Sequence, residues 1–409
     1  MSEQLVQQQY ETGEIVMKKI KKNPSVQQMK TALSDSYEQR EYKIENIIQT
    51  SETYQYEQKI QTKDKRNFKI YAQLCNIFLQ YGHCKFGKSC KFRHIPIRKD
   101  KIPVENFNYN LNEIKLCNKI DEKELINLEY SIKPQQSKLN ENDNLILIRH
   151  GISVYNYVGN KFSYETGKIF KDISALQYQL DPKLIDSPLH FYGVQQCINQ
   201  QKIINKIKFH TIFVSPQLRA LQTCYHLIKE HQDYKDKKIK IFVLPLLTEI
   251  LSKVQDIASI GEEREKNFEE FEKLGFDFKY LVDESYGNKR DPNLWQLYDI
   301  KNLKLREKIK NQMIQNNKNY NETCLALIKE NFPKSVETYE MVYERKLEAK
   351  QFIKNYIKKN KLHNKKEQKI CIISHHGFLK TWTSSGISQS GYVIHGNSFG
   401  NCQLVSDKL

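Results

Sequence analysis

Residues 144–156 read NLILIRHGISVYN, and residues 372–378 read IISHHGF. Each begins with a short run of apolar, largely β-branched residues that stops at a histidine, His150 in the first and His375 in the second. Runs of this kind are typical of buried strands in a parallel sheet. Open α/β sheets place their sites at the carboxyl ends of such strands. The two stretches therefore predict two histidines at one edge of a sheet.

Strand-like and helical segments alternate along the C-terminal two thirds of the chain. Short apolar runs occur at residues 145–148, 211–215, 240–245 and 369–374. Helical patterns occur at residues 193–207, 217–231 and 337–360. Such alternation predicts an α/β domain with a mostly parallel sheet covered on both faces, over residues 141–409. The polar, irregular stretch 250–336 is interpreted as a helical insertion over the sheet edge.

The composition narrows the class of partner. The chain has 409 residues and carries 65 Lys or Arg against 48 Asp or Glu, a net charge of +17. This excess favours a polyanionic partner or an acidic substrate, and a generally lysine-rich composition is the alternative. We find no signal peptide and no apolar run long enough to span a membrane, and nine cysteines favour metal binding over disulfides. A cytoplasmic or nuclear location is expected.

The N-terminal third divides into three segments by composition. Residues 1–62 are polar, show no sustained apolar period, and are predicted to be a disordered arm. Residues 63–101 carry eleven Lys or Arg against two Asp, which is more than half of the net charge. Residues 102–140 are polar and rich in Asn and Lys, and are interpreted as a linker. The basic charge is therefore concentrated on the middle segment.

This basic segment contains a set of metal ligands within the stretch CNIFLQYGHCKFGKSCKFRH. The ligands, spaced x8, x5 and x3, are Cys75, Cys84, Cys90 and His94. Three thiolates and one imidazole complete a tetrahedral set for structural Zn²⁺ and leave no open position for catalysis. His83 is the alternative imidazole, but it adjoins Cys84. Because so short a segment cannot bury a core, bound zinc would supply its folding free energy.

The segment resembles the CCCH zinc fingers of RNA-binding proteins, in ligand spacing and in the glycines and aromatic residues between the ligands. The resemblance implies that Phe86 and Phe92 stack on bases of single-stranded RNA, since stacking needs only a flat ring. The chain has one such finger and not two, and some fingers of this family bind proteins. Single-stranded RNA or a ribonucleoprotein is the expected partner, and a protein partner is the alternative.

A second set of residues suits phosphoryl transfer. Transfer to an enzyme group needs a nucleophile, positive charge on the non-bridging oxygens and a proton for the leaving oxygen. His150 can act as a nucleophile while its imidazole is neutral, and Arg149 beside it offers a planar guanidinium that matches phosphate. Arg219, one helical turn after a strand-like run, and His375 can reach the same edge. Asn156 can donate its amide to a phosphate oxygen.

In these motifs the chain resembles the histidine phosphatase superfamily, the phosphoglycerate mutase-like enzymes. The matching segments, in the order found in that family, are LIRHGISVYN, DSPLHFYGVQQ, SPQLRALQT, LPLLTEI and ISHHGFL. The resemblance implies a three-layer α/β sandwich and a covalent phosphohistidine on His150, with no metal needed for catalysis. The residues implied to bind phosphate are Arg149, Arg219, His375 and Asn156. The family's acidic proton donor corresponds to Glu249.

Two assignments at this site have rivals. The alternatives to Glu249 as proton donor are Glu262, Glu263 and Asp256. A donor carboxyl needs a raised pKa, which burial can provide but a sequence cannot show. Of the tandem histidines, His375 takes the place of the family's histidine, and His376 falls in a variable position.

The motifs together predict a phosphoric monoester hydrolase that works through a phosphohistidine and carries a zinc finger that binds RNA. A phosphoglycerate mutase-type phosphotransferase is an alternative, although the residues with which mutases hold phosphoglycerate are not recognisable. An RNA-binding regulatory protein with a catalytically inactive phosphatase-like scaffold is the other alternative. The sequence does not identify the phosphorylated substrate, and residues 250–336 are interpreted as the region that selects it.

Overall fold

A computed structural model of the protein describes residues 100–128, 137–282, 293–362 and 368–409. The described residues belong to one compact unit. The predicted arm at residues 1–62 lies outside the described residues. So does the predicted finger, with its four metal ligands and the rings of Phe86 and Phe92.

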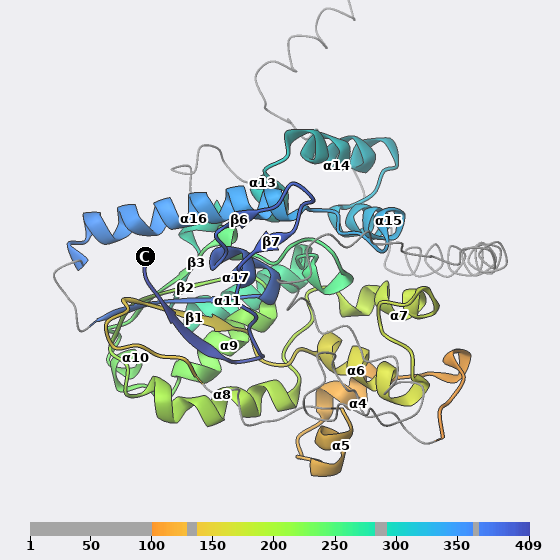
Figure 1. The fold of residues 1–409 in the computed structure, drawn as a ribbon, viewed down its shortest axis with the longest axis horizontal. Coiled ribbons are helices and arrows are strands. Elements are labelled where there is room, and N and C mark those ends of the chain that lie inside the picture. Colours follow the sequence, from red (N-terminus) through yellow and green to blue (C-terminus); the bar gives the residue numbers. More distant parts are fainter. Residues whose placement is uncertain (1–99, 129–136, 283–292, 363–367) are drawn as a thin grey trace, which may run out of the picture. The chain divides into compact units, whose positions relative to one another are not determined.

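A six-stranded sheet has the strand order β4-β3-β2-β5-β1-β8 (Figure 1). Its parallel strands are β1 (Leu145–Arg149), β2 (Phe209–Val214), β3 (Lys240–Val243), β4 (Phe276–Asp277) and β5 (Lys369–Ser374). The remaining strand, β8 (Leu404–Asp407), is antiparallel to β1 and forms one edge. Four of the strands coincide with the apolar runs, because a strand covered on both faces is apolar throughout. The predicted mostly parallel α/β sheet is confirmed.

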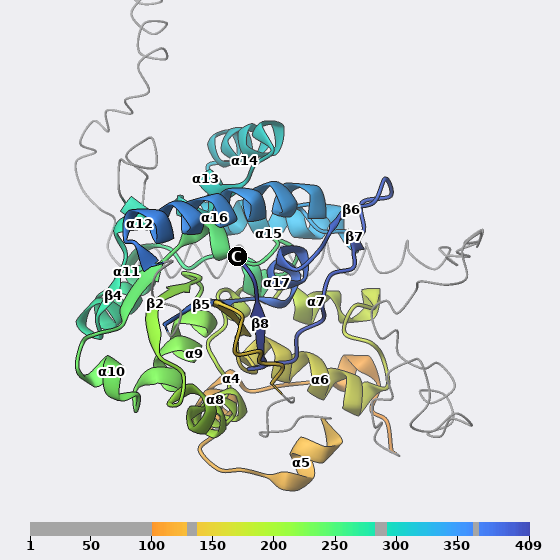
Figure 2. The ribbon, with the colours of Figure 1, turned by 60° about the vertical axis from the view of Figure 1, so that its left-hand side comes forward.

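Helices cover both faces of this sheet (Figure 2). The helices over one face are α8 (Phe191–Ile204) and α9 (Leu218–Ile228), and those over the other are α16 (Tyr339–Lys359) and α17 (His376–Trp382). Successive strand residues point to opposite faces. Ile148 of β1 accordingly packs in the core shared with α9, whereas its neighbour Leu147 packs in the core shared with α16. Two cores thus separate three layers, and the predicted three-layer sandwich is confirmed.

The strands β1 and β5 are neighbours near the middle of the sheet, and their register aligns their carboxyl ends. Arg149 pairs with Ser374 in this register. The next residue of each chain segment is a histidine, so His150 and His375 leave the sheet side by side. The ring centroids of these two histidines are 5.1 Å apart. The prediction that both histidines reach one sheet edge is confirmed.

The segment interpreted as a linker, residues 102–140, contains structure in its described part. Its elements are η2 (Val104–Asn106), α4 (Leu111–Leu116) and α5 (Glu122–Asn127). Phe107 is buried and packs edge-on against Phe162 of the helix α6 (Val154–Thr166), with the two ring centroids 5.0 Å apart. The linker interpretation was wrong for residues 104–128. Their apolar side chains are interspersed with polar ones and form no long apolar run, so only contact with α6 reveals their burial.

Residues 250–336 are largely helical, as predicted, but they also contribute to the sheet and to a core. Their elements besides β4 are η6 (Val254–Asp256), α11 (Gly261–Lys273), α12 (Lys279–Val282), α13 (Trp295–Asp299), α14 (Leu303–Gln315) and α15 (Tyr320–Asn331). The strand β4 pairs with β3 as the outer strand of the sheet. Leu251, Leu297 and Leu327 are fully buried in a core that includes Val158 of α6. The region therefore supports the domain rather than lying over it.

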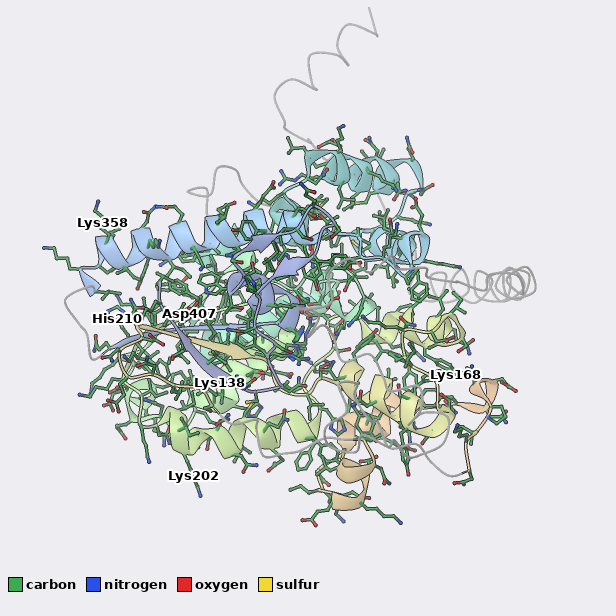
Figure 3. All side chains as sticks on the ribbon, viewed as in Figure 1. Lys138, Lys168, Lys202, His210, Lys358 and Asp407 are labelled. Carbon is green, nitrogen blue, oxygen red and sulfur yellow. The ribbon has the colours of Figure 1, made fainter. Side chains whose placement is uncertain are left out.

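The remaining elements connect these layers. They are η3 (Ile173–Ala175), α7 (Leu176–Gln179), η4 (Pro182–Leu184), α10 (Gln232–Lys235), η5 (Pro245–Leu247), β6 (Gly386–Ile387) and β7 (Val393–Ile394). Lysines mark the solvent side of both helical layers, as Lys202 of α8 and Lys358 of α16 show in Figure 3. Among the helices of the described residues, none combines the length and the apolar character needed to cross a membrane.

Candidate active site

His150 directly follows β1 and is 3% exposed. Its Nδ1 lies 2.6 Å from the carbonyl oxygen of Gly151. A carbonyl oxygen can only accept a hydrogen bond, so Nδ1 carries the ring proton and donates it. In the neutral imidazole the lone pair is then on Nε2. The backbone of the RHG motif thus selects the tautomer in which Nε2 is the nucleophilic atom.

The surroundings of His150 keep this imidazole neutral. Burial lowers the pKa of His150 well below its usual value, and the positive charges of Arg219 and Arg149 lower it further. Each of these causes disfavours a charged ring. At neutral pH the lone pair on Nε2 is therefore present, as a nucleophile requires.

Arg149 and the carbonyl of His150 are held by residues that precede β8. The Arg149 Nη1 donates to the carbonyl oxygen of Phe399 at 2.8 Å, and the Nδ1 of His376 donates to the same oxygen at 3.2 Å. The amide of Asn401 donates to the carbonyl oxygen of His150 at 3.2 Å. No sequence signal marked Phe399 or Asn401, because their contribution depends on β8 returning beside β1.

Arg219 lies in the first turn of α9 and is fully buried. Its Nη1 donates to the carbonyl oxygen of Gln255 at 2.5 Å, and its Nη2 donates to Asp256 Oδ1 at 3.1 Å. Its Nε is also buried and has no hydrogen-bond partner within the part of the chain that the structure describes. The 250–256 segment therefore orients Arg219 while leaving one N–H of the guanidinium for another acceptor.

His375 is the residue that precedes α17, and it is fully buried. Its Nε2 lies 2.8 Å from the hydroxyl oxygen of Ser215, at the end of β2. Its Nδ1 is buried and, among the described residues, has no hydrogen-bond partner. Burial, and then the positive charge of Arg219, lowers the pKa of His375 well below its usual value. A neutral His375 can therefore present an N–H at Nδ1 when Ser215 donates to Nε2.

Glu249 is half-buried. Its carboxylate accepts hydrogen bonds from backbone N–H groups in the first turn of α17. Oε2 accepts the N–H of Gly377 at 2.9 Å, and Oε1 accepts the N–H groups of Phe378 and Ile250, each at 3.0 Å. His375, at the capping position, makes no side-chain bond to the helix, so Glu249 satisfies these N–H groups instead. A Cβ on Gly377 would lie 2.6 Å from Glu249 Oε1, which explains the glycine. One lone pair of Oε2 stays available for a proton.

The alternatives to Glu249 differ in their location. Asp256 is 1% exposed, and its carboxylate accepts from Arg219 and, at 3.0 Å, from the backbone N–H of Lys253. Burial raises the pKa of Asp256 to about 6, and the charge of Glu249 adds to the rise while Arg219 opposes it. Glu262 and Glu263 are exposed in the first turn of α11. Within the described residues, neither pairs with a residue of this site, whereas Asp256 does.

Asn156 lies in the first turn of α6. Its Oδ1 accepts the N–H of Ser153 at 3.2 Å, and its own N–H donates to the hydroxyl of Ser153 at 3.2 Å. This reciprocal capping box holds the amide in one orientation. Because the carbonyl end of the amide is used, the NH₂ end is the group that can donate to a ligand.

Comparison with known proteins adds to this picture. Residues 72–96 match the zinc finger family of C-x8-C-x5-C-x3-H type (and similar), so the predicted CCCH finger is confirmed as a family member. No curated protein matches the chain. The finger segment is thus the part of the sequence for which a family is shown.

Solved structures similar to this one include a phosphoglycerate mutase and two phosphatases. The mutase, from Bacillus anthracis, is 15% identical, with 66% of this chain and 94% of that chain covered and a TM-score of 0.31. Ecdysone phosphate phosphatase from Bombyx mori is 14% identical, with 64% and 86% covered and a TM-score of 0.30. Phosphoserine phosphatase from Entamoeba histolytica is 18% identical, with 58% and 76% covered and a TM-score of 0.26.

Proposed function

We propose that this protein is a phosphatase that transfers the phosphoryl group of a monoester to His150 and then to water. The observation that carries the proposal is the bond from His150 Nδ1 to the carbonyl of Gly151, which leaves the lone pair of a neutral ring on Nε2. The buried Nε of Arg219 and Nδ1 of His375 support it, because both lack partners among the described residues. A phosphate oxygen is the kind of acceptor that such donors need.

In the first step, His150 Nε2 attacks phosphorus, a P–N bond forms and the P–O bond to the leaving group breaks. Arg149 and Arg219 stabilise charge on the non-bridging oxygens, and the N–H of His375 can add a further donor. Glu249, in its protonated form, gives its proton to the leaving oxygen. In the second step water attacks phosphorus, the P–N bond breaks and the water proton returns to Glu249. Inorganic phosphate is released and both residues regain their starting forms.

Two other functions follow from different uses of the same residues. A phosphoglycerate mutase-type phosphotransferase would pass the phosphoryl group from His150 to a second substrate instead of water. An inactive scaffold would form no phosphohistidine. The neutral, tautomer-selected ring of His150 favours an active site, because a scaffold has no need of a nucleophilic Nε2 beside two arginines.

A trapped intermediate tests this proposal. We expect the full-length chain, mixed with radiolabelled phenyl phosphate and quenched in alkali, to retain label that is stable in alkali and lost in acid. This stability pattern is that of a phosphoramidate, the bond expected at His150. Peptide mass spectrometry should place the phosphate on the peptide that contains His150. If several monoesters leave no label, or if the label maps to another residue, the proposed reaction is excluded.

We further propose that the finger holds one structural Zn²⁺ and binds single-stranded RNA. The donor set of Cys75, Cys84, Cys90 and His94 suits zinc, since it offers three thiolates and one imidazole. Bound zinc would supply roughly 10–16 kcal/mol of folding free energy to a segment too short for its own core. The eleven basic residues of segment 63–101 suit a polyanion. The finger would in this way bring the phosphatase to RNA or to a ribonucleoprotein.

A separate prediction concerns the binding of RNA by the finger. Phe86→Ala combined with Phe92→Ala should weaken the binding of labelled single-stranded RNA to the full-length chain by roughly tenfold or more, since each stacked base contributes about 1–3 kcal/mol. Anisotropy titration measures the affinity, and zinc analysis should still find one ion per chain. Phe68→Ala, outside residues 72–96, is the matched control. Unchanged RNA affinity in the double variant would favour a protein partner for the finger.

A further inference from the structure

One buried side chain binds the loop that carries Glu249. This side chain, Arg345 of α16, is 1% exposed. Its Nη1 donates to the carbonyl oxygen and the hydroxyl of Thr248, at 2.6 and 2.7 Å, and to the carbonyl oxygen of Leu246 at 3.4 Å. Its Nη2 donates to the carbonyl oxygen of Glu249 itself at 3.4 Å. Three carbonyls of the segment 246–249, at the end of η5 and just after it, thus bind a single planar guanidinium, whose fork of donors can reach them together.

A buried carboxylate completes this contact. Glu337, 3% exposed, lies just before α16, and its Oε2 accepts from Arg345 Nη2 at 3.4 Å. The same oxygen accepts the N–H of Leu251 at 2.8 Å, two residues beyond Glu249. The Arg345–Glu337 pair therefore binds the loop on both sides of Glu249. Since both charges are buried, removing either one would leave the other without its partner.

Arg345 also contacts the helix that receives the Glu249 carboxylate. Its guanidinium carbon lies 5.5 Å from the ring centroid of Phe378, whose N–H donates to Glu249 Oε1. The backbone of Glu249 and one of the groups that bind its side chain are thus both held by Arg345. Both contacts place Arg345 next to groups that bear on the position of the Glu249 carboxylate.

We infer that Arg345, supported by Glu337, is the positioning residue that holds Glu249 where it delivers a proton to the leaving oxygen. The inference rests on the proposed function and deepens it. Arg345 acts through Glu249 and is not itself a catalytic residue. Because misplacement of a reacting group by about 1 Å can cost 10²-fold in rate, a small shift of this loop should be visible in the kinetics.

Two substrates whose leaving groups differ in their need for a proton distinguish a positioning role of Arg345 from a purely structural one. A dinitrophenolate leaves without a proton, whereas the alkoxide of glycerol phosphate needs one. Arg345→Lys keeps the buried charge but loses the fork, so we expect kcat/KM for glycerol phosphate to fall by about 10- to 100-fold. For dinitrophenyl phosphate, we expect less than about a threefold fall. Adding Glu249→Gln to Arg345→Lys should cause little further loss, because both changes remove one function.

Lys346 offers a matched control on the same helix. It is 3% exposed, and its Nζ donates to the carbonyl oxygen of Ser384 at 2.9 Å, away from the Glu249 loop. Lys346→Met should lower the rates for both substrates by similar factors, if it lowers them at all. Should Arg345→Lys fail to fold, Thr248→Val removes one acceptor of Arg345 and should show the same leaving-group dependence in milder form.

Amide hydrogen exchange provides a readout that needs no activity. The N–H groups of Gly377 and Phe378 should exchange faster in Arg345→Lys and Thr248→Val, but not in Lys346→Met. Equal losses for both substrates, additive effects with Glu249→Gln, or unchanged exchange at these amides would overturn the inference. Failure of the proposed function gives a different result, because the wild-type chain would then take no phosphate label at His150. The exchange rates of the Gly377 and Phe378 amides would still show whether Arg345 positions Glu249.

Discussion

His150→Ala is expected to lower kcat for every phosphate monoester that the protein hydrolyses by at least about 10⁴-fold, and to abolish alkali-stable labelling. The physical reason is that Nε2 of His150 forms the bond to phosphorus, and water bound in its place is a far weaker nucleophile. Arg149 and Arg219 would still bind phosphate, so product inhibition by inorganic phosphate should persist. Steady-state hydrolysis and labelling of the full-length variant measure the effect.

His210→Ala is the matched control for this substitution. His210 is the second residue of β2, near the amino end of that strand (Figure 3), whereas Ser215, which contacts His375, follows its carboxyl end. Its removal should leave both turnover and labelling within about threefold of the wild-type values. Retention of more than about a tenth of the activity by His150→Ala would contradict the phosphohistidine mechanism. Label transferred to His375 in that variant would instead assign the nucleophile to the neighbouring ring.

Arg219→Leu is expected to lower kcat/KM by about 10²–10³-fold and to move the acid limb of the pH profile toward higher pH. The rate falls because a buried donor to the non-bridging oxygens is lost. The limb moves because Arg219 contributes the largest charge effect that lowers the pKa of His150. Without that charge the pKa of His150 rises, the ring is protonated at a higher pH, and the nucleophilic lone pair is lost sooner on acidification.

Two further variants test the cause of this shift. Arg219→Lys keeps a positive charge but not the planar fork, so it should lower the rate while shifting the acid limb less than Arg219→Leu does. Arg264→Leu is the control, because Arg264 is also buried, at 5% exposure, but pairs with Glu265 of α11 at 3.0 Å. A pH profile of kcat/KM for each variant decides the point. An acid limb that stays in place in Arg219→Leu would show that burial alone controls the pKa of His150.

The four longer parallel strands could be predicted from the sequence, and the short edge strands could not. A central strand such as β5 is buried on both faces, so its residues KICII are apolar after the first lysine. The outer strand β4 has two residues, one buried and one half-buried, and its pairing is determined by β3. Local composition carries no signal for such a strand, because the neighbour provides the hydrogen-bond partners.

The burial of residues 104–128 was hidden for a related reason. Phe107 lies in the alternating stretch NFNYNLN, and Leu125 stands beside Ile126 in a charged stretch, so neither pattern indicates by itself the surface against which it packs. They become core residues because α6 and its neighbours present apolar surface at the right place. A linker and a packed segment of this composition therefore look alike until the rest of the domain is folded.

By itself, the sequence determined where two histidines lie: the apolar runs that precede His150 and His375 place both at one edge of a parallel sheet. It also predicted the CCCH finger from the spacing of its cysteines and histidine, and the family match at residues 72–96 confirms that finger. The tertiary structure alone decided how the site is held. The bonds from Asn401 to His150 and from Arg345 to Glu249 join residues 251 and 96 positions apart. No local pattern encodes them, because each forms only when folding brings distant backbone carbonyls beside a buried donor.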